Sequence, residues 1–452
     1  MISNLEIVKN YSPDCRIRRR VLPLVVLSLA AASLASAATL CVNSNGKGGC
    51  KSTISAAVAA ASAGDTIQVY QGTYKEQVTI TQSLSLIAAP NAQPVIEAKG
   101  KSNGIFVNGL AATPNAGVAN VVISGFTVRD ANFEGILVVN GSNVTLVDNH
   151  VLDNNKALEP SAGACPGIPA FETNEQMDCG EGIHLMAVDH STVIRNLVEN
   201  NSGGILITDE TGPTGSNLIK GNNVHDNPYA CGITMAGHPA ANASGPIANA
   251  PSYGIMHNVI SHNDSHHNGL GLPGAGAGIG IFAPGPGTTN TANVITGNEL
   301  HDNGLPGVTM HNHGSAPAPA PGVNLNDNII VGNHIYGNAA DTEDAATSGP
   351  TGINIYSTVP VTGTVIAQND FRDESIEIAF KAPGGWITAH FNDFNDRGIG
   401  IDNLGTGLID ATENWWRCST GPSSKCSSIA GSGVSFNPWL TQPFDFNPVG
   451  YW

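Results

Sequence analysis

Apolar and polar positions recur along this chain in a fixed order. The stretch NVITGNELHDNG, residues 293–304, returns in similar form as NLIKGNNVHDN at 217–227 and NIIVGNHIYGN at 328–338. In each of them an apolar residue lies three positions before a central asparagine, and another lies two positions after it. Short segments of period two between turn residues predict β-strands. The asparagines in this register are Asn149, Asn196, Asn222, Asn263, Asn298, Asn333, Asn369, Asn392 and Asn414.

Most repeats also contain a second pattern, Gly-Ile-x-apolar. One repeat therefore holds about three short strands, and the last two intervals between the asparagines are only 23 and 22 residues. A unit of this size cannot bury its apolar side alone and has to stack on its neighbours, which predicts an all-β solenoid, a parallel β-helix of about ten coils. The second pattern occurs as GILV (135–138), GIHL (182–185), GILI (204–207), GITM (232–235), GIFA (280–283), GVTM (307–310) and GINI (352–355).

The repeated asparagines have a structural explanation. In coils stacked about 4.8 Å apart, they point inward and bond to one another through their amides, since buried amides persist only when paired. His225, His266 and His301 lie three residues after their asparagines and point outward on adjacent coils. Two interpretations stay open for these histidines: solvated turn residues of a repeat, or a stacked imidazole metal site.

Both ends of the solenoid are expected to be capped. Residues 52–64 predict a short helix that covers the first coil, with Ser52 or Thr53 as N-cap and Gly64 as its stop. The loop 418–426 and the tail after it would cover the last coil, which prevents edge-to-edge association. The expected divisions are a signal peptide at 1–37, the N-terminal cap and first coil at 38–80, the β-helix with inserted loops at 81–416, and a C-terminal cap at 417–452.

The N-terminus has the three parts of an export signal. Basic residues between Arg16 and Arg20 precede the apolar run VLPLVVLSLAAASL and the small residues Ala35-Ser36-Ala37. The run is short for a bilayer span, and no later segment is expected to cross a membrane. We therefore expect cleavage near Ala37 and a secreted or periplasmic protein, acting as a monomer.

Charge limits the partners of the chain. Its formal net charge is −17 at pH 7, and loss of residues 1–37, with five basic and two acidic side chains, would make it about −20. Such a surface repels nucleic acid and other polyanions. No nucleic-acid partner is expected, and an anionic substrate has to bind against this repulsion.

The cysteines fit an oxidising compartment. Seven of them follow residue 37, and one, Cys231, is left after close neighbours are paired. We expect Cys231 to be a buried thiol in a strand rather than a nucleophile. The expected disulfides, each closing a short loop, are Cys41–Cys50, Cys165–Cys179 and Cys418–Cys426.

From Cys41 onward the chain resembles the secreted right-handed parallel β-helix proteins of the pectin-lyase-like superfamily. The resemblance rests on CVNSNGKGGC, on the helix followed by GDTIQVYQGTYKEQVTI, on the asparagine-laddered coils and on ENWWRCSTGP. Members include polysaccharide lyases, glycoside hydrolases, epimerases, pectinesterases, phage depolymerases and non-catalytic repeat proteins. The resemblance therefore implies a right-handed β-helix but no single activity.

The catalytic motifs of the better-known subfamilies do not occur in the chain. It lacks the polygalacturonase set Asn-Thr-Asp, Asp-Asp, Gly-His-Gly and Arg-Ile-Lys, and it lacks the Trp-Ile-Asp-His and Arg-x-Pro-x-x-Arg signatures of pectate lyases. The Asp-Pro-His motif of alginate epimerases is absent as well. No catalytic residue is therefore carried over from these subfamilies.

Extra residues relative to a bare coil border the Gly-Ile-x-apolar strand, which predicts a groove walled by loops. They fall at 155–180, 209–216, 237–254, 269–278, 312–326 and 339–350. Strand alternation turns one set of side chains outward into this groove. We expect four of them, His184, Phe282, Asn354 and Tyr356, to contact a polysaccharide. The rest of the set comprises Leu206, Thr208, Thr234, Thr309, His311, Lys381 and Asp402.

The favoured chemistry is that of a polysaccharide lyase, which cleaves a uronate-containing polysaccharide by β-elimination. Such an enzyme needs a base for the proton α to the carboxyl group and a cation that neutralises this group. Asp209 and Glu210 are candidate ligands of calcium, which prefers several oxygen ligands. The candidate bases are His238, His311, His313 and Lys381, with the imidazole pair of 311 and 313 first because it is the densest.

Two other classes stay open. A glycoside hydrolase needs two carboxylates about 5–9.5 Å apart, and Asp209 or Glu210 would form such a pair with Asp178 or Glu181. A non-catalytic binding or structural solenoid is compatible with the few charges of the groove. Insertions clustered along one strand face argue against that third class, because a purely structural coil has no need for walls.

Overall fold

The computed structural model describes residues 37–111, 117–159, 165–173, 179–312, 322–342 and 344–444. The chain divides into two units, Met1–Ser36 and Ala37–Trp452, and every described residue belongs to the second. The expected signal peptide therefore lies, except for Ala37, outside the described residues.

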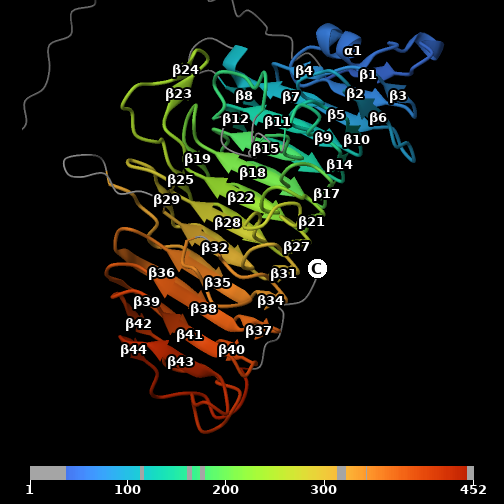
Figure 1. The fold of residues 1–452 in the computed structure, drawn as a ribbon. Helices are drawn as coiled ribbons and strands as arrows, with labels where there is room; N and C mark the ends of the chain where they lie inside the picture. Colours follow the sequence, from blue (N-terminus) through green and yellow to red (C-terminus); the bar gives the residue numbers. More distant parts are fainter. Residues whose placement is uncertain are drawn as a thin grey trace, which may run out of the picture. The chain divides into compact units, whose positions relative to one another are not determined.

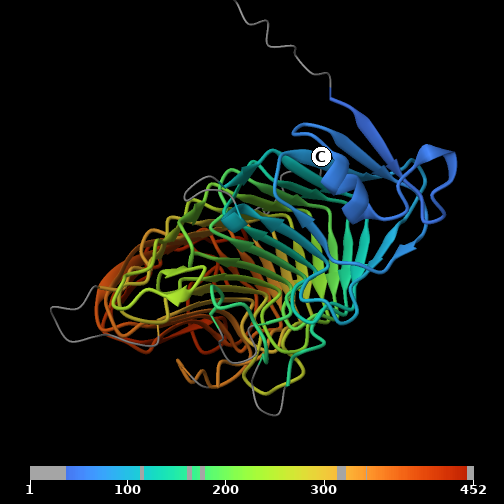
Figure 2. The same cartoon turned by 90° about the horizontal axis from the view of Figure 1, so that it is seen from above.

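The second unit is a stack of coils whose strands form three long parallel sheets (Figure 1). Each strand of these sheets pairs in parallel with the strand one coil further along, so segments 19 to 47 residues apart in sequence become direct neighbours (Figure 2). The predicted all-β parallel β-helix is confirmed. Against the expected ten coils, the three sheets hold 14, 11 and 12 strands.

The sheets are named A, B and C in the order in which the chain enters them. Sheet A contains β1 (Thr39–Val42), β2 (Thr66–Val69), β5 (Leu84–Ala88), β9 (Val121–Ser124), β13 (Thr145–Val147), β16 (Thr192–Ile194), β20 (Leu218–Lys220), β26 (Val259–Ser261), β30 (Val294–Thr296), β33 (Ile329–Val331), β36 (Val361–Ala367), β39 (Gly385–His390), β42 (Leu408–Asp410) and β44 (Val434–Ser435).

Sheet B contains β3 (Thr73–Tyr74), β6 (Val95–Glu97), β10 (Thr127–Arg129), β14 (His150–Leu152), β17 (Leu197–Glu199), β21 (Asn223–His225), β27 (Asp264–His266), β31 (Glu299–His301), β34 (His334–Tyr336), β37 (Asp370–Arg372) and β40 (Asp393–Phe394). Sheet C contains β4 (Val78–Ile80), β7 (Ile105–Asn108), β11 (Ile136–Val139), β15 (Ile183–Met186), β18 (Ile205–Thr208), β22 (Ile233–Ala236), β28 (Ile279–Phe282), β32 (Val308–His311), β35 (Thr351–Tyr356), β38 (Ile376–Lys381), β41 (Ile399–Asn403) and β43 (Ser428–Gly431).

Short elements complete the coils. They are the 3-10 helices η1 (Lys47–Gly49) and η2 (Gly109–Ala111), the parallel strands β8 (Val118–Ala119) and β12 (Gly141–Ser142), the parallel strands β19 (Thr214–Gly215), β25 (Ile255–Met256) and β29 (Asn290–Thr291), and the antiparallel pair β23 (Ala241–Asn242) and β24 (Gly245–Pro246).

The helix expected within residues 52–64 is α1 (Ile54–Ala60), which ends with Ala61 as its C-cap, before the expected stop at Gly64. Thr53 is its N-cap, and the Thr53 hydroxyl accepts a hydrogen bond from Ala56 N at 3.2 Å. Ile54, Ala57 and Val58 are buried against the first strands of the stack. Among the described residues, no helix has both the length and the apolar character that a membrane span requires.

The cysteine pattern is confirmed. Disulfides join Cys41 to Cys50, Cys165 to Cys179 and Cys418 to Cys426. Cys231 is buried as expected, but it lies two residues before β22 rather than in a strand; its sulfur accepts a hydrogen bond from Ala277 N at 3.2 Å.

Apolar side chains from all three sheets form one core that runs through the coils from Val42 to Trp416. Asparagine ladders connect the coils at their corners. The predicted ladder is confirmed from Asn149 to Asn414; in it, for example, Asn263 Nδ2 donates to Asn298 Oδ1 at 3.0 Å. A second ladder runs five residues further along each coil, from Asn154 to Asn338, and ends on Glu374. A third ladder, unforeseen, consists of Asn217, Asn258, Asn293 and Asn328.

Candidate functional site

The expected groove residues lie on the outer face of sheet C, on consecutive strands. In one register position His184 is followed by Leu206, Thr234, Gly280, Thr309, Asn354, Ala379 and Asp402. Two residues further along each strand the position is held by Met186, Thr208, Ala236, Phe282, His311, Tyr356 and Lys381. Strand alternation predicted these rows because successive side chains of a strand point to opposite faces.

His311, at the end of β32, is the centre of the first polar cluster on this face. Its Nδ1 lies 2.7 Å from Asp344 Oδ2, and its Nε2 lies 3.3 Å from Asp341 Oδ2. Asn354 Nδ2 is 3.1 Å from the same Nε2, which the Thr309 hydroxyl also contacts. The side chain is only 3% exposed, so these neighbours decide its chemistry.

The charge state of His311 follows from this environment. Burial disfavours the charged ring, but the hydrogen bonds and charges of Asp341 and Asp344 outweigh burial, and the pKa of His311 is raised. The ring is therefore held as an imidazolium over a wider pH range than a free histidine. In that state it can neutralise a substrate carboxylate or donate a proton.

Asp341 organises the loop that covers this cluster. Its carboxylate accepts hydrogen bonds from Asp344 N at 2.9 Å and Ala345 N at 3.3 Å, and it also accepts one from the Asn354 side chain. Sequence reasoning named the inserted loop 339–350 but neither aspartate, because nothing in a single insertion shows which of its acids returns to the strand face. The acidic composition of residues 341–344 was the feature of the sequence that could have indicated these aspartates.

Lys381 adds a cation beside the cluster. Its Nζ donates to Asp344 O at 3.1 Å and to Ala345 O at 3.5 Å, and it lies 5.2 Å from the centre of the Tyr356 ring. The Lys381 ammonium group thus contacts two carbonyl groups and an aromatic ring. The structure brings Lys381, Tyr356 and His311 together, whereas His313 lies outside the described residues.

A second, fully buried cluster lies further toward the N-terminal end of the same face. His184 Nε2 is 2.9 Å from Thr208 Oγ1, and ligand atoms of His184, Glu134 and Glu172 lie within 4.8 Å of one another. Burial lowers the pKa of His184 to about 4, so this ring is neutral at neutral pH. Glu134 and Glu172 were not among the sequence candidates.

The remaining sequence candidates belong to this buried region. His238 Nδ1 lies 3.3 Å from Glu210 Oε1. Asp209 accepts hydrogen bonds from the backbone amides of His238 and Gly254, and burial raises the pKa of Asp209. A calcium ion at Asp209 would have to displace these amides. Glu181 is also buried.

The other carboxylate named for the hydrolase pair, Asp178, lies outside the described residues.

The histidines of the repeated motif lie on another face, that of sheet B. His225, His266 and His301 stack with ring centres 4.9 and 4.7 Å apart and planes within 11° of parallel. Tyr336 continues the stack at 4.6 Å from His301. We call the three histidines the imidazole stripe. The predicted outward position on adjacent coils is confirmed by the register of β21, β27 and β31.

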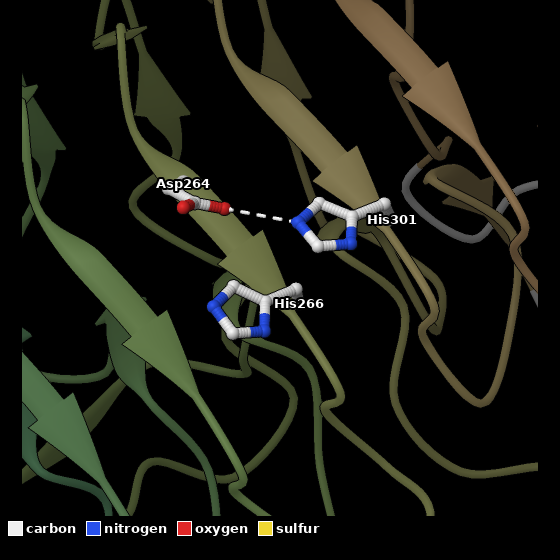
Figure 3. Close-up of side chains that lie close together, drawn as sticks. All are labelled: Asp264, His266 and His301. Carbon is white, nitrogen blue, oxygen red and sulfur yellow. Dashed lines mark ion pairs between the residues drawn. The ribbon is translucent and has the colours of Figure 1, made fainter.

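Asp264 lies beside the imidazole stripe (Figure 3). Its Oδ1 is 3.4 Å from His301 Nε2, and ligand atoms of Asp264, His266 and His301 lie within 4.8 Å of one another. Burial opposes ionisation of Asp264, but the hydrogen bond to His301 and the neighbouring imidazoles outweigh it, and the pKa of Asp264 is lowered. A carboxylate and two imidazoles are donors that divalent transition metals accept.

Comparison with known proteins identifies the fold family. A family model described as a right handed beta helix region matches residues 40–258. This match gives the chain a right-handed β-helix, the fold that its resemblance to the pectin-lyase-like superfamily implies. A second family model, described as periplasmic copper-binding protein (NosD), matches residues 170–374 of this β-helix protein. No curated relative matches its sequence.

Solved structures share the fold at low sequence identity. The Agl-KA catalytic domain is 15% identical with a TM-score of 0.52, and the alignment covers 86% of this chain and 64% of that chain. The pre-mature bacteriophage phi29 gene product 12 is 13% identical with a TM-score of 0.53, covering 83% of this chain and 52% of that chain. Pectate lyase Pel9A is 14% identical with a TM-score of 0.45, covering 90% and 80%. At these identities the likeness concerns the fold alone.

Proposed function

We propose that this β-helix protein is a secreted or periplasmic carbohydrate-active enzyme that binds a polysaccharide along the outer face of sheet C. One observation carries the proposal. Phe282, His311, Tyr356 and Lys381 occupy one register position on the consecutive strands β28, β32, β35 and β38. With strands about 4.8 Å apart, this row is about 14 Å long, which suits several sugar rings.

The row combines aromatic rings and polar groups, the two kinds of side chain that bind a glycan. Phe282 offers an aromatic ring at one end of the row and Tyr356 offers one in its interior, and both lie edge-on to the His311 ring at 5.8 and 6.1 Å. Aromatic rings bury large apolar area and carry little conformational entropy, which favours stacking on sugar faces. Asn354 adds an amide between the row and Asp341.

Among the reactions such a face can support, β-elimination on a uronate fits the charges best. The His311 imidazolium would neutralise the substrate carboxylate, which would take the place at Nδ1 that Asp344 now holds at 2.7 Å. Lys381, in its neutral form, would take the proton α to that carboxyl group. The electron pair of that C–H bond then forms the double bond, the bond to the glycosidic oxygen breaks, and the departing oxygen takes up the proton from the Lys381 ammonium.

The first test is a panel of uronate-containing and neutral polysaccharides, incubated with mature protein and assayed by ultraviolet absorbance and by release of reducing ends. Elimination raises both signals, because the product is unsaturated. Lys381→Ala is expected to lower kcat/KM by roughly 100-fold or more, the usual loss for a catalytic base. Lys220→Ala, on β20 of sheet A, is the matched control and should retain full activity.

The outcomes separate the candidate classes. Reducing ends without absorbance would mean hydrolysis and would move the assignment to Asp341 and Asp344, whose carboxylates both reach His311. Full activity in both Lys381→Ala and His311→Gln would overturn the assignment of this row. A silent panel would replace the enzyme by a polysaccharide-binding solenoid.

A further inference from the structure

The imidazole stripe has no part in the proposed carbohydrate chemistry, because it lies on sheet B and the catalytic row lies on sheet C. A β-helix needs the inward asparagines at these corners for its ladders, but it has no structural need for three outward imidazoles in register. The stripe is also not apolar packing, since each ring contacts an acid or another imidazole. Its function therefore has to come from its own geometry.

The distances at Asp264 match those of a metal site. Two ligand atoms that are each about 2.1 Å from a tetrahedrally coordinated ion lie about 3.4 Å apart. Asp264 Oδ1 and His301 Nε2 are 3.4 Å apart already. His266 brings its ligand atom to within 4.8 Å of both, and a rotation of its side chain would bring that atom to bonding distance of the ion. Figure 3 shows both rings with a nitrogen directed to the side on which Asp264 lies.

The second nitrogen of each ring is held in the way that metal-bound histidines require. His301 Nδ1 is 2.8 Å from Asp302 Oδ2, and His266 Nδ1 is 2.7 Å from His267 Nδ1. A histidine that donates its other N–H to an acceptor is fixed in orientation and tautomer, so that its Nε2 lone pair faces the ion. His225 repeats the arrangement with Asp226 at 2.8 Å.

The Oδ1 atom of Asp264 supports the same assignment. This atom is buried, and its neighbour His301 Nε2 lies 3.4 Å away, which is long for a hydrogen bond. A buried carboxylate oxygen with so weak a donor is costly, and a bound cation would remove that cost.

We propose that Asp264, His266 and His301 bind one divalent transition-metal cation, with Cu²⁺ held most tightly. Two imidazoles and a carboxylate suit Cu²⁺ and Zn²⁺, and for such donors affinity increases toward Cu²⁺. Calcium and magnesium are excluded as preferred ions because they take oxygen ligands. His225 stacks on His266 with ring centres 4.9 Å apart but lies outside this group of three ligand residues.

The test is a Cu²⁺ titration of mature, chelator-stripped protein by calorimetry, together with electron paramagnetic resonance at less than one equivalent of Cu²⁺. We expect one tightly bound ion whose spectrum contains nitrogen couplings from imidazole. The double variant His266→Ala/His301→Ala should weaken binding by roughly 100-fold or more and lose those couplings. His190→Ala is the matched control, since His190 also pairs with an aspartate, Asp189, but lies off the stripe.

A further variant protects the test against misfolding. Asp264→Asn keeps the size of the side chain, and we expect it to weaken Cu²⁺ binding about 10-fold. Unchanged affinity in both the double variant and Asp264→Asn would overturn the proposal and direct attention to the groups at His184 and His311. Loss of binding in His190→Ala to the same degree would also overturn it, because the ion would then be bound by scattered surface histidines. The readout is binding, so it is independent of any polysaccharide activity.

Discussion

At the scale of single residues, the three positions of the repeated His-Asp-Asn triplet have three different structural roles. In 301–303 the histidine points outward from sheet B, the aspartate forms the corner, and Asn303 joins the second ladder. Asp302 has a φ of 54°, a left-handed conformation that aspartate tolerates better than most side chains. Asp226 has the same φ in the equivalent corner. The two aspartates thus turn the chain and also orient the imidazoles of the stripe.

Glu374 is a residue-level exception in the second ladder, and it makes stability depend on pH. Its Oε1 accepts hydrogen bonds from Asn338 N at 3.1 Å and Asn338 Nδ2 at 3.0 Å. Burial raises the pKa of Glu374 from 4.5 to about 8. Between these values the folded state holds a proton that the unfolded chain has released. This contribution to stability is therefore complete below the unfolded pKa and is lost as pH rises through the folded pKa.

We expect Glu374→Gln to remove this part of the pH dependence, because an amide oxygen accepts the same hydrogen bonds without a charge. The measurement is the urea midpoint at pH 5 and pH 9. Between these pH values the wild type should lose stability relative to the variant by a few kcal/mol, an order-of-magnitude expectation. Glu159→Gln, at an exposed position, is the control. Identical pH curves for Glu374→Gln and the wild type would contradict this explanation.

At the scale of elements, the coils are held by backbone pairing on three sides and by amide ladders at the corners. Each ladder asparagine both donates to and accepts from its neighbours one coil away, so the ladders pair polar groups that the turns would otherwise bury without partners. The third ladder lies at the corner before sheet A, where Asn217, Asn258, Asn293 and Asn328 precede β20, β26, β30 and β33. Three sheets and three ladders keep successive coils in register.

Asn298→Ala is expected to destabilise the fold by about 2–4 kcal/mol, because it leaves several buried partners without hydrogen bonds. Asn298 Oδ1 accepts from Asn263, and its Nδ2 donates to Ile260 O and Asn333 Oδ1. The check is the shift of the urea midpoint. Asn223→Ala, an exposed position on β21, should change stability by less than about 0.5 kcal/mol. Equal effects of the two substitutions would mean that the ladder is not a main source of stability.

At the scale of the whole molecule, charge acts on any anionic substrate before contact. The formal net charge of −17 repels a polyuronate at long range, whereas the His311 imidazolium acts only over a short distance. The two effects differ in their response to salt, because screening weakens interactions beyond a Debye length far more than those at contact.

For a uronate polymer, kcat/KM is therefore expected to rise several-fold as ionic strength increases from about 10 mM to about 150 mM, over which the Debye length falls from about 30 Å to about 8 Å. Initial rates at low substrate concentration would measure this change. A neutral polysaccharide serves as the comparison and should show no such rise. A fall of kcat/KM with salt for the uronate polymer would mean that attraction at the site outweighs the net charge.

Much of this molecule follows from short-range patterns in the sequence. The 22- and 23-residue intervals, the period-two strands and the inward asparagines were enough to predict the parallel β-helix, the first ladder and the outward rows of sheets B and C. These features recur in most coils from Asn149 onward, so those coils support the same interpretation. The third ladder was missed although its asparagines lie a constant five residues before Asn222, Asn263, Asn298 and Asn333.

The sequence alone thus determined the stack, the register and the direction of each strand side chain, because these depend on local alternation and on a repeat of nearly constant length. Only the tertiary structure decided which loop acids reach the strand faces, as Asp341 and Asp344 reach His311. It also decided that Asp209 is held by backbone amides and that Asp264 faces two imidazoles. Insertions differ from coil to coil, so the repeat does not predict the path of their backbone. The distances between the side chains of a site are set only when the coils have stacked.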